Sequence, residues 1–400
     1  MSILAAAFFL PLMIASFAFY ILCGISVTWF TREKRRKTGS CQEPVSLLVP
    51  VCGIDGRAYE NWARLCRQKH PDYEVLFCVM DPKDPAVPIL KELVDKCARR
   101  LSGFTARRVQ LHFSKSPIGT NHQICNLIHL LKMAEHEWVV FADSDIRVGP
   151  EYLSTVTAPL SARSVGVVTC GYLDRTPRSL GAAVAALDRG IDFTPSVLLA
   201  RKLDGGLKFA MGATIAVKKS VIAGFGGLET LLNRIGSDYH IGKMASEAGY
   251  RVLLSHYVID NDCGKESLPD VFERELRWAR TIRINRGIQF YGLGFSYGTV
   301  YCIPLLLLSG FAGWALWACG LVFAARLFQA AAVFWSLDAP WLALWVWALP
   351  IREAMNFAVW AAGCFGHTVK WRGRRLRIAQ GGLVFDAAKS LLPEPGPGQL

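Results

Sequence analysis

The chain has 400 residues, a formal net charge of +13 and a hydrophobic fraction of 52%, with 22 Phe and 12 Trp. The apolar residues gather in long uncharged segments with basic residues beside them, which indicates a membrane protein and excludes nucleic acid as the expected partner. Twelve Cys without a Cys-x-x-Cys pair and eight His without ligand spacing exclude a zinc site and a disulfide framework.

The first apolar segment covers residues 3–30, which contain no charged side chain and are long enough to cross a bilayer core of roughly 30 Å. A cleaved signal peptide is the alternative, but such a peptide has basic residues before its apolar part. Here five basic residues and one acid follow it, at 32–37. That order favours an uncleaved anchor with its basic cluster in the cytosol, and we assign residues 1–38 to it.

Residues 39–290 indicate a soluble α/β domain in which strands and helices alternate. The expected strands are 45–51, 73–80, 108–113 and 138–142, and the expected helices between them are 59–69, 86–100 and 122–136. This alternation predicts a doubly wound, mostly parallel sheet. Ligands of such sheets bind beyond the carboxyl ends of the strands.

Acidic residues follow two of these strands directly. Asp81 ends the strand 73–80, and Asp143 and Asp145 end the apolar strand 138–142. Closely spaced carboxylates at the end of a buried strand suit Mg²⁺ or Mn²⁺ shared with phosphate oxygens. The alternative is an ordinary Asx-turn and helix cap, where Asp is common. The convergence of acids from two strands favours the metal-diphosphate interpretation.

A third acid, Asp238, stands at the start of an expected helix over 239–248. An Asp at that position is often a cap or a first-turn acid, which the helix dipole stabilises. It also suits a general base that removes the proton from an attacking hydroxyl. The two interpretations are compatible.

A basic and aromatic helix precedes the second membrane region. Arg274, Arg277 and Trp278 fall within about one turn of a helix over 272–283. Such a stretch is often a solvated or lipid-facing surface. The same residues are able to supply positive charge to a leaving diphosphate and an indole face to a sugar or headgroup.

Two further apolar blocks follow, at 297–325 and 327–350, the second interrupted by Asp338. We expect both to span the membrane, and the shorter segment 354–366 to lie in the interface or to re-enter. Two crossings then place the basic residues of 370–377 on the same side as the first basic cluster. This assigns 291–368 to the membrane and 369–400 to a basic cytosolic tail.

An Asp at a strand end, an Asp-x-Asp pair, a third Asp and Arg-x-x-Arg-Trp before membrane helices form an ordered set. The set resembles membrane-bound inverting glycosyltransferases with the GT-A fold, most closely the ceramide glucosyltransferase family, family 21. The likeness extends through 351–355 and 371–377. Two departures are Asp145, where the family often has Gly, and Gln123, where it usually has Lys.

The resemblance implies a role for each motif. Asp81 would contact the uracil and ribose of a UDP-sugar, with Asn121 added to the donor-binding set from its glycine-bearing loop. Asp143, assisted by Asp145, would hold Mg²⁺ or Mn²⁺ against the diphosphate, and Asp238 would be the base. Arg274, Arg277 and Trp278 would close over the diphosphate and the acceptor.

The resemblance also implies a function and a location. We expect a hexosyltransferase that moves a sugar, with UDP-glucose as the expected donor, onto a ceramide-like membrane lipid. Transfer of N-acetylglucosamine to a hopanoid polyol, processive polysaccharide synthesis and a catalytically silent scaffold are the alternatives. The expected location is the bacterial inner membrane, with the catalytic domain facing the cytosol.

Overall fold

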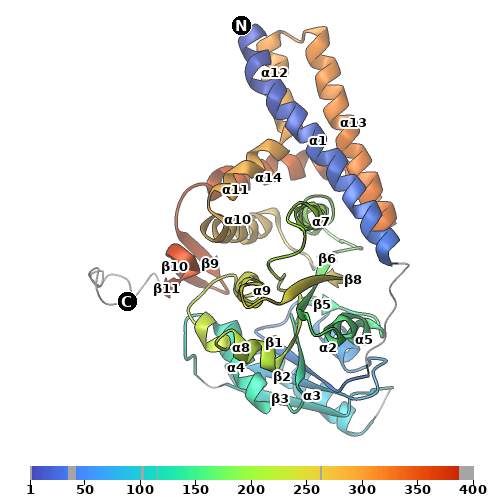
Figure 1. The fold of residues 1–400 in the computed structure, drawn as a ribbon, viewed down its shortest axis with the longest axis vertical. Coiled ribbons are helices and arrows are strands. Elements are labelled where there is room, and N and C mark those ends of the chain that lie inside the picture. The colour runs from blue at the N-terminus through green and yellow to red at the C-terminus, as the bar shows by residue number, and fades with distance from the viewer. Residues whose placement is uncertain (1, 35–41, 101–102, 115, 262–263, 387–400) are drawn as a thin grey trace, which may run out of the picture.

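The computed structural model describes residues 2–34, 42–100, 103–114, 116–261 and 264–386, and it places an α/β domain below a group of long helices (Figure 1). The centre of the domain is an eight-stranded sheet in the order β3-β2-β1-β4-β7-β6-β8-β5. Its strands are β1 (Val45–Val51), β2 (Tyr73–Val79), β3 (Arg108–Phe113), β4 (Trp138–Ala142), β5 (Ile146–Arg147), β6 (Val165–Leu173), β7 (Thr214–Lys218) and β8 (Arg251–Asn261).

The sheet is mixed and mostly parallel. Strands β3, β2, β1 and β4 pair in parallel, as do β6 and β8, whereas β7 and β5 run antiparallel to their neighbours. Every residue of β2 and β4 is buried, which explains why these strands are uninterrupted apolar runs in the sequence. The predicted α/β sheet is confirmed, with the four predicted strands within a residue of their expected ends.

Helices cover both faces of this sheet. On one face lie α2 (Ala58–Leu65), α3 (Ala86–Ala98) and α5 (Tyr152–Thr157); on the other lie α4 (His122–Met133), α8 (Lys219–Gly224) and α9 (Ser237–Glu247). The alternation of side chains along β1 separates the two cores. Leu47 packs in the core that contains Trp62 of α2, and Leu48 packs in the core that contains Ile124 of α4.

Two helices are long and apolar enough to cross a membrane, and they lie side by side: α1 (Ser2–Lys34) and α13 (Gly313–Ser336) (Figure 1). Helix α12 (Gly298–Ser309) packs against both of them, and α11 (Ile288–Gly292) precedes α12 in the chain. The segments Ile288–Ser296 and Gly298–Ser309 meet at 61°, and within the described residues they give a third span only if counted together. The predicted N-terminal anchor is therefore a helix suited to crossing a membrane.

The predicted limits of the two C-terminal spans are wrong. The chain turns between α12 and α13 at Gly310 and Phe311, which have φ of 65° and 57°, so 297–325 is not one helix. A left-handed glycine is a common end for a helix, and the surrounding apolar block concealed it. Helix α13 then continues past residue 326. The rest of the second block forms a 3-10 segment, Pro340–Ala348, and the start of α14 (Leu349–Gly363).

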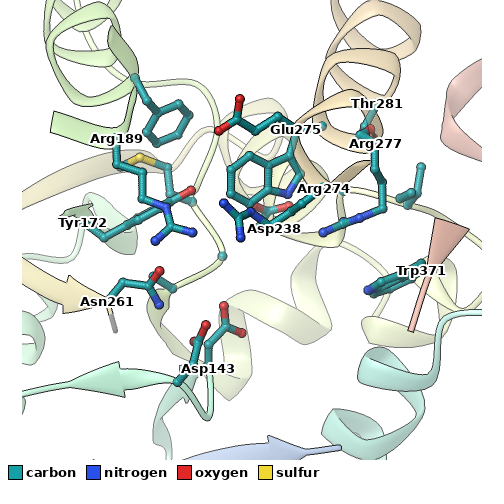
Figure 2. A pocket seen from close by; sticks show the side chains of 18 of the residues that line it. Asp143, Tyr172, Arg189, Asp238, Asn261, Arg274, Glu275, Arg277, Thr281 and Trp371 are labelled. Atoms are coloured by element: carbon teal, nitrogen blue, oxygen red, sulfur yellow. Dashed lines mark hydrogen bonds between the residues drawn. The ribbon is translucent and has the colours of Figure 1, made fainter. Parts of the chain in front are cut away.

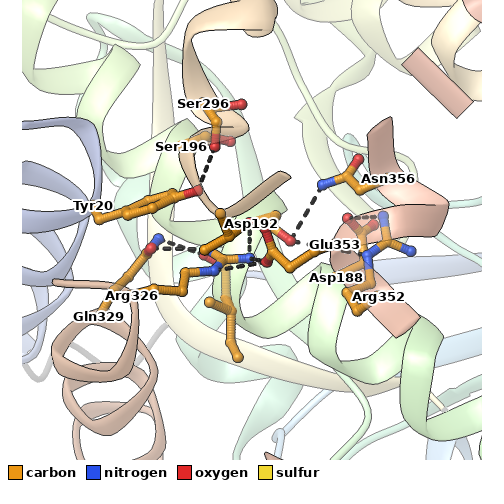
Figure 3. A network of polar contacts seen from close by, with 12 residues as sticks. Tyr20, Asp188, Asp192, Ser196, Ser296, Arg326, Gln329, Arg352, Glu353 and Asn356 are labelled. Carbon is orange, nitrogen blue, oxygen red and sulfur yellow. Dashed lines mark hydrogen bonds and ion pairs between the residues drawn. The ribbon is translucent and has the colours of Figure 1, made fainter. Parts of the chain in front are cut away.

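Arg326, the charge that divided the predicted blocks, is accommodated by partners from far along the chain. Its guanidinium lies 2.7 Å from a carboxylate oxygen of Asp192 and 2.5 Å from one of Glu353 on α14 (Figure 3). Because a buried cation is tolerated only when it is paired, these acids allow Arg326 to remain inside the helix. Helix α14 packs against α10 (Leu268–Arg286) and contains most of the segment 354–366.

The segment after α14 forms a small antiparallel sheet of β9 (Thr368–Trp371), β10 (Arg374–Ile378) and β11 (Val384–Asp386). It lies beside α10, close to the C-terminal end of the described chain (Figure 1). The predicted basic tail, 369–400, thus starts within a folded sheet, and its residues 387–400 lie outside the described residues, as do residues 35–37 of the first basic cluster.

Candidate active site

A cavity of about 1780 Å³ lies where the carboxyl ends of β1, β2 and β4 face α10 and the small sheet. It brings together seven of the eight predicted site residues: Asp81, Asp143, Asp145, Asp238, Arg274, Arg277 and Trp278. Figure 2 shows Asp143 on one wall, with Asp238, Arg274 and Arg277 facing it from the other. The eighth residue, Asn121, does not line the cavity.

Asn121 instead has a structural task. Its side-chain oxygen accepts a hydrogen bond from the backbone N–H of Ile124 at 3.2 Å and so caps α4. Its amide nitrogen donates to the backbone oxygen of Arg234 at 2.7 Å. Because Asn121 is fully buried, caps α4 and does not line the cavity, its side chain is not placed to contact a donor as predicted.

Asp143 directly follows β4, and Asp145 lies two residues later, so the two acids flank Ser144 in a tight turn. The indole N–H of Trp62 donates to the backbone oxygen of Ser144 at 3.0 Å and fixes that turn. Gln123 donates to Asp143 at 3.0 Å, and Asn261 at the end of β8 is hydrogen-bonded to Asp145. Gln123, the departure from the family's usual Lys, therefore binds the acid directly and stays in the site.

The surroundings of these two acids favour a bound cation. Burial raises the pKa of Asp143, and the negative charges of Asp145 and Asp238 raise it further. Burial also raises the pKa of Asp145, although its hydrogen bond to Asn261 opposes this. Carboxyl groups whose pKa is raised by burial and by neighbouring acids are stabilised in their ionised form by a bound cation.

The described residues contain no group of three or more His, Cys, Asp or Glu side chains able to enclose a metal ion. A complete protein cage is therefore absent from that part of the chain, while two carboxylates with open coordination fit Mg²⁺ or Mn²⁺ completed by phosphate oxygens.

Asp238 is the second residue of α9. Gly236 directly precedes this helix, and its φ of 69° allows the chain to turn into it. Burial raises the pKa of this carboxyl group, while hydrogen bonds from the backbone N–H groups of Tyr239, Asp238 and Gly212 and the charge of Arg277 lower it. A Cβ at Gly212 would lie 3.2 Å from an Asp238 oxygen. Asp238 is therefore both a first-turn acid and a buried, oriented carboxylate that faces the cavity, as a general base requires.

Helix α10 presents the basic and aromatic motif. A capping box of Ser267 and Asp270 starts the helix. The Trp278 ring has three guanidinium groups within 6.0 Å of its centre: those of Arg189 at 5.8 Å, Arg274 at 5.3 Å and Arg277 at 6.0 Å. Arg189, Arg274 and Arg277 lie on the wall that faces Asp143, where Asp238 also lies (Figure 2).

The guanidinium of Arg274 on this wall is incompletely hydrogen-bonded. Arg274 pairs with Glu266 through Nη1, but its buried Nε and Nη2 have no hydrogen-bond partner among the described residues. Burial and the charge of Arg274 lower the pKa of Arg277 to about 10, against the opposing effect of Asp238. Close guanidinium groups with free donors form a site for an anion such as a diphosphate.

A buried ion pair holds this wall to the membrane-side helices. Arg352 of α14 is 1% exposed and lies 2.6 Å from Glu275. It also lies 2.8 Å from Asp188 (Figure 3). Glu275 is next to Arg274 in the chain, and Asp188 is next to Arg189. Arg352 therefore fixes the two backbone segments that carry cavity arginines.

Asp81 is the second residue after β2, where it is exposed and lines the cavity. Its carboxylate accepts a hydrogen bond from the backbone N–H of Lys83 at 2.8 Å. Its second carboxylate oxygen is available at the rim, which suits the contact with a nucleoside predicted for it.

Arg189, Trp371 and Arg372 are among the cavity residues that were not predicted as site residues. Arg189 lies in a π-helical turn, η2 (Asp188–Phe193), a local geometry often found at functional sites, but periodicity gave no sign of it. Trp371 and Arg372 belong to a basic stretch that suggested a cytosolic tail, and its Arg-Gly dipeptide is not one of the usual hairpin signals.

The sequence matches the family described as Glycosyl transferase family 21 over residues 9–384. The chain belongs to glycosyltransferase family 21. Two similar proteins from Caenorhabditis elegans are ceramide glucosyltransferase 1, 21% identical over 86% of this chain and 74% of the relative, and ceramide glucosyltransferase 3, 22% identical over 66% and 56%. The chain thus spans less than two thirds of the second relative.

Solved structures with a partial likeness include a mannosyltransferase, PcManGT from Pyrobaculum calidifontis, in complex with GDP-Man and Mn²⁺. Its TM-score is 0.46 and its identity 17%, over 88% of this chain and 97% of that one. Glucosyl-3-phosphoglycerate synthase from Mycobacterium tuberculosis has a TM-score of 0.37 and 13% identity, over 62% and 79%.

Family 21 membership confirms the resemblance drawn from the ordered acids and the Arg-x-x-Arg-Trp motif. It also confirms the prediction of an enzyme, a hexosyltransferase, on the α/β sheet described above. With two helices suited to crossing a bilayer, the family 21 chain is a membrane protein.

Proposed function

We propose that this protein transfers a hexose from a UDP-sugar, with UDP-glucose as the expected donor, to the hydroxyl of a ceramide-like membrane lipid. The observation that carries the proposal is the extent of the cavity. Asp143 and Asp238 line one part of it, while Phe19 of α1, Leu293 and Trp360 of α14 line another. A water-soluble donor and a lipid therefore have access to one chamber, and the names of the two relatives support ceramide and glucose.

Donor binding would rest on the acids at the strand ends. Asp81 would contact the uracil and ribose at the rim. Asp143 and Asp145 would hold Mg²⁺ or Mn²⁺, which when bound neutralises charge on the diphosphate. Arg274 and Arg277 would donate hydrogen bonds to the phosphate oxygens from the opposite wall, and the unpartnered Nε and Nη2 of Arg274 support this role.

Transfer would then follow as a single displacement. Asp238 takes the proton from the lipid hydroxyl as that oxygen forms a bond to the anomeric carbon. The bond from this carbon to the phosphate oxygen breaks on the opposite side, so the configuration inverts and UDP leaves. A positioned base contributes about 10²–10⁴-fold to such a step, and the Trp278 ring would cover the sugar or the headgroup.

The proposed setting is the bacterial inner membrane, with the catalytic domain in the cytosol. The basic residues at 32–34 and 370–377 support this orientation, because cytosolic flanks are enriched in Lys and Arg. UDP-sugars made in the cytosol would then reach the cavity directly.

The test is expression of the full chain in a host that lacks glycolipids, fed with ceramide or a hopanoid polyol. Mass spectrometry of the extracted lipids should show ceramide with one added hexose. An added N-acetylhexosamine on the hopanoid would replace the proposed donor and acceptor, and a long polymer would indicate a polysaccharide synthase. Unmodified lipids, together with no binding of any UDP-sugar, would refute the transferase proposal.

A further inference from the structure

The hairpin between β9 and β10 has an unusual loop residue. Trp371 pairs with Arg374, so the loop is the dipeptide Arg372-Gly373, with φ of 47° and 76°. Positive φ at both positions is the type I′ turn, which strongly favours Asn-Gly. Arginine in the first position is strained, because its Cβ crowds the backbone in the left-handed region. An arginine at this strained position indicates that its side chain has a function outside the turn.

The hairpin is held firmly across one side of the cavity. On the α10 side, Lys370 lies 2.5 Å from Glu273, and Arg280 donates to the backbone oxygen of Thr368 at 2.5 Å. On the opposite side, Arg374 donates to the backbone oxygen of Thr120 at 2.9 Å. A loop fixed at both ends holds its side chain in place, and electrostatic stabilisation is most effective with such preorganised groups.

Arg372 projects from this hairpin into the cavity lining. Its Nη2 lies 3.4 Å from a carboxylate oxygen of Asp55, and the side chain is 53% exposed. An exposed ion pair of this kind contributes little to stability, so the Asp55 contact does not account for the strained residue. Arg372 lines the same cavity as the predicted metal ligands Asp143 and Asp145.

Arg372 is also close to the other cations. Its neighbour Trp371 has the Arg277 guanidinium 5.8 Å from its ring centre, and the charge of Arg372 contributes to lowering the pKa of Arg277. The basic wall therefore continues from α10 onto the hairpin. Guanidinium groups that converge at the edge of an acid-lined cavity match an anion that bridges the two walls.

We propose that Arg372 is a further donor-binding residue, which contacts the diphosphate of the nucleotide sugar from the hairpin side. The inference rests on the proposed function, since it needs a nucleoside diphosphate sugar in the cavity. Its guanidinium would meet the phosphates alongside Arg277, with its two-pronged donor geometry matched to phosphate oxygens. As the leaving group gains charge, the same contact would stabilise it.

The test variant is Arg372→Asn, because Asn is favoured at this turn position and removes the charge without adding strain. Arg372→Gly also fits the turn and serves as a second neutral variant. Arg372→Lys keeps the positive charge but lacks the paired N–H donors of the guanidinium. The matched control is Arg375→Gln, which removes an equal charge from an exposed position on β10 outside the cavity. Each full-length protein is purified in detergent, and thermal unfolding, UDP affinity by calorimetry and donor KM are measured.

We expect Arg372→Asn and Arg372→Gly to weaken UDP binding and raise the donor KM by about 10- to 100-fold, with an unfolding temperature at or above wild type. Arg372→Lys should fall between them and wild type, and Arg375→Gln should match wild type. Equal UDP affinity in wild type and either neutral variant would overturn the Arg372 assignment and leave the proposed function standing. A wild-type protein that binds no UDP in the presence of Mn²⁺ would overturn both.

Discussion

Replacing Arg352 by Met should strongly destabilise the protein, because it leaves buried acids without their cation. Met has a similar length and no charge. Arg352 is 1% exposed, and its partner Glu275 is 5% exposed at 2.6 Å. Removing one partner of a buried pair of this kind costs about 3–5 kcal/mol, since the remaining charge stays buried and unpaired.

The matched control is Lys69→Met. Lys69 lies 2.9 Å from Glu151, almost the same separation, but the two side chains are 71% and 60% exposed. An exposed pair contributes about 0–1 kcal/mol, so this variant should barely change stability. The comparison isolates burial from distance. Equilibrium unfolding in mixed detergent micelles, followed by tryptophan fluorescence, measures both changes in the free energy of unfolding.

The effect of Arg352→Met should also depend on pH. Burial raises the pKa of Asp188 to about 7, against the lowering effect of Arg352. An acid whose pKa is higher in the folded protein than in the unfolded chain contributes stability at low pH, and this contribution is lost as pH rises toward about 7. At pH 5 Asp188 is protonated and neutral, so leaving it buried without Arg352 costs less free energy. The variant should therefore lose less stability at pH 5 than at pH 8. Equal losses for Arg352→Met and Lys69→Met at pH 8 would refute the reasoning.

Three further predictions concern the chemistry. Asp238→Asn should lower kcat by about 10²–10⁴-fold with UDP affinity nearly unchanged, and wild-type kcat should fall as acid protonates Asp238, whose pKa is raised by burial; a pH-rate profile and calorimetry check both. Asp143→Asn should reduce kcat/KM by about 10²–10³-fold, and Asp145→Asn by less, because its environment already includes Asn261; Mn²⁺ titrations in the presence of UDP would reveal the order. Gly212→Ala should lower kcat with an unchanged unfolding temperature, since its methyl group would press on the Asp238 carboxylate from 3.2 Å, and a fully active variant would show that the carboxylate tolerates displacement.

The sequence predicted those parts of the fold that depend on local pattern. Strands β2 and β4 are apolar throughout because both of their faces are buried, so their limits were visible in the chain. Asp81 and Asp143 could be combined because parallel strands bring their carboxyl ends to the same edge, whereas Asp238 lies in the first turn of α9. Seven of the predicted site residues line the cavity, three of them after strands and four on α9 and α10, and their roles stay predictions.

Long-range partners decided the features that were missed. Arg326 looked like a boundary between two spans because Asp192 and Glu353, which neutralise it, are distant in the sequence. Asn121 looked like a ligand because its bond to the backbone of Arg234 depends on tertiary folding. Arg372 looked like part of a solvated tail because its place in the cavity depends on how the small sheet packs against α10.

The bend between Ile288–Ser296 and Gly298–Ser309 has a consequence for how a lipid would be chosen. The first of these segments supplies Phe290, Leu293 and Ser296 to the cavity wall at the base of the long helices (Figure 1). A lipid acceptor bound at this wall would insert only its headgroup into the cavity. Its hydrocarbon tails would remain among those of neighbouring lipids. Selection would then act on headgroup stereochemistry, and acyl chains of different length would be used at similar rates.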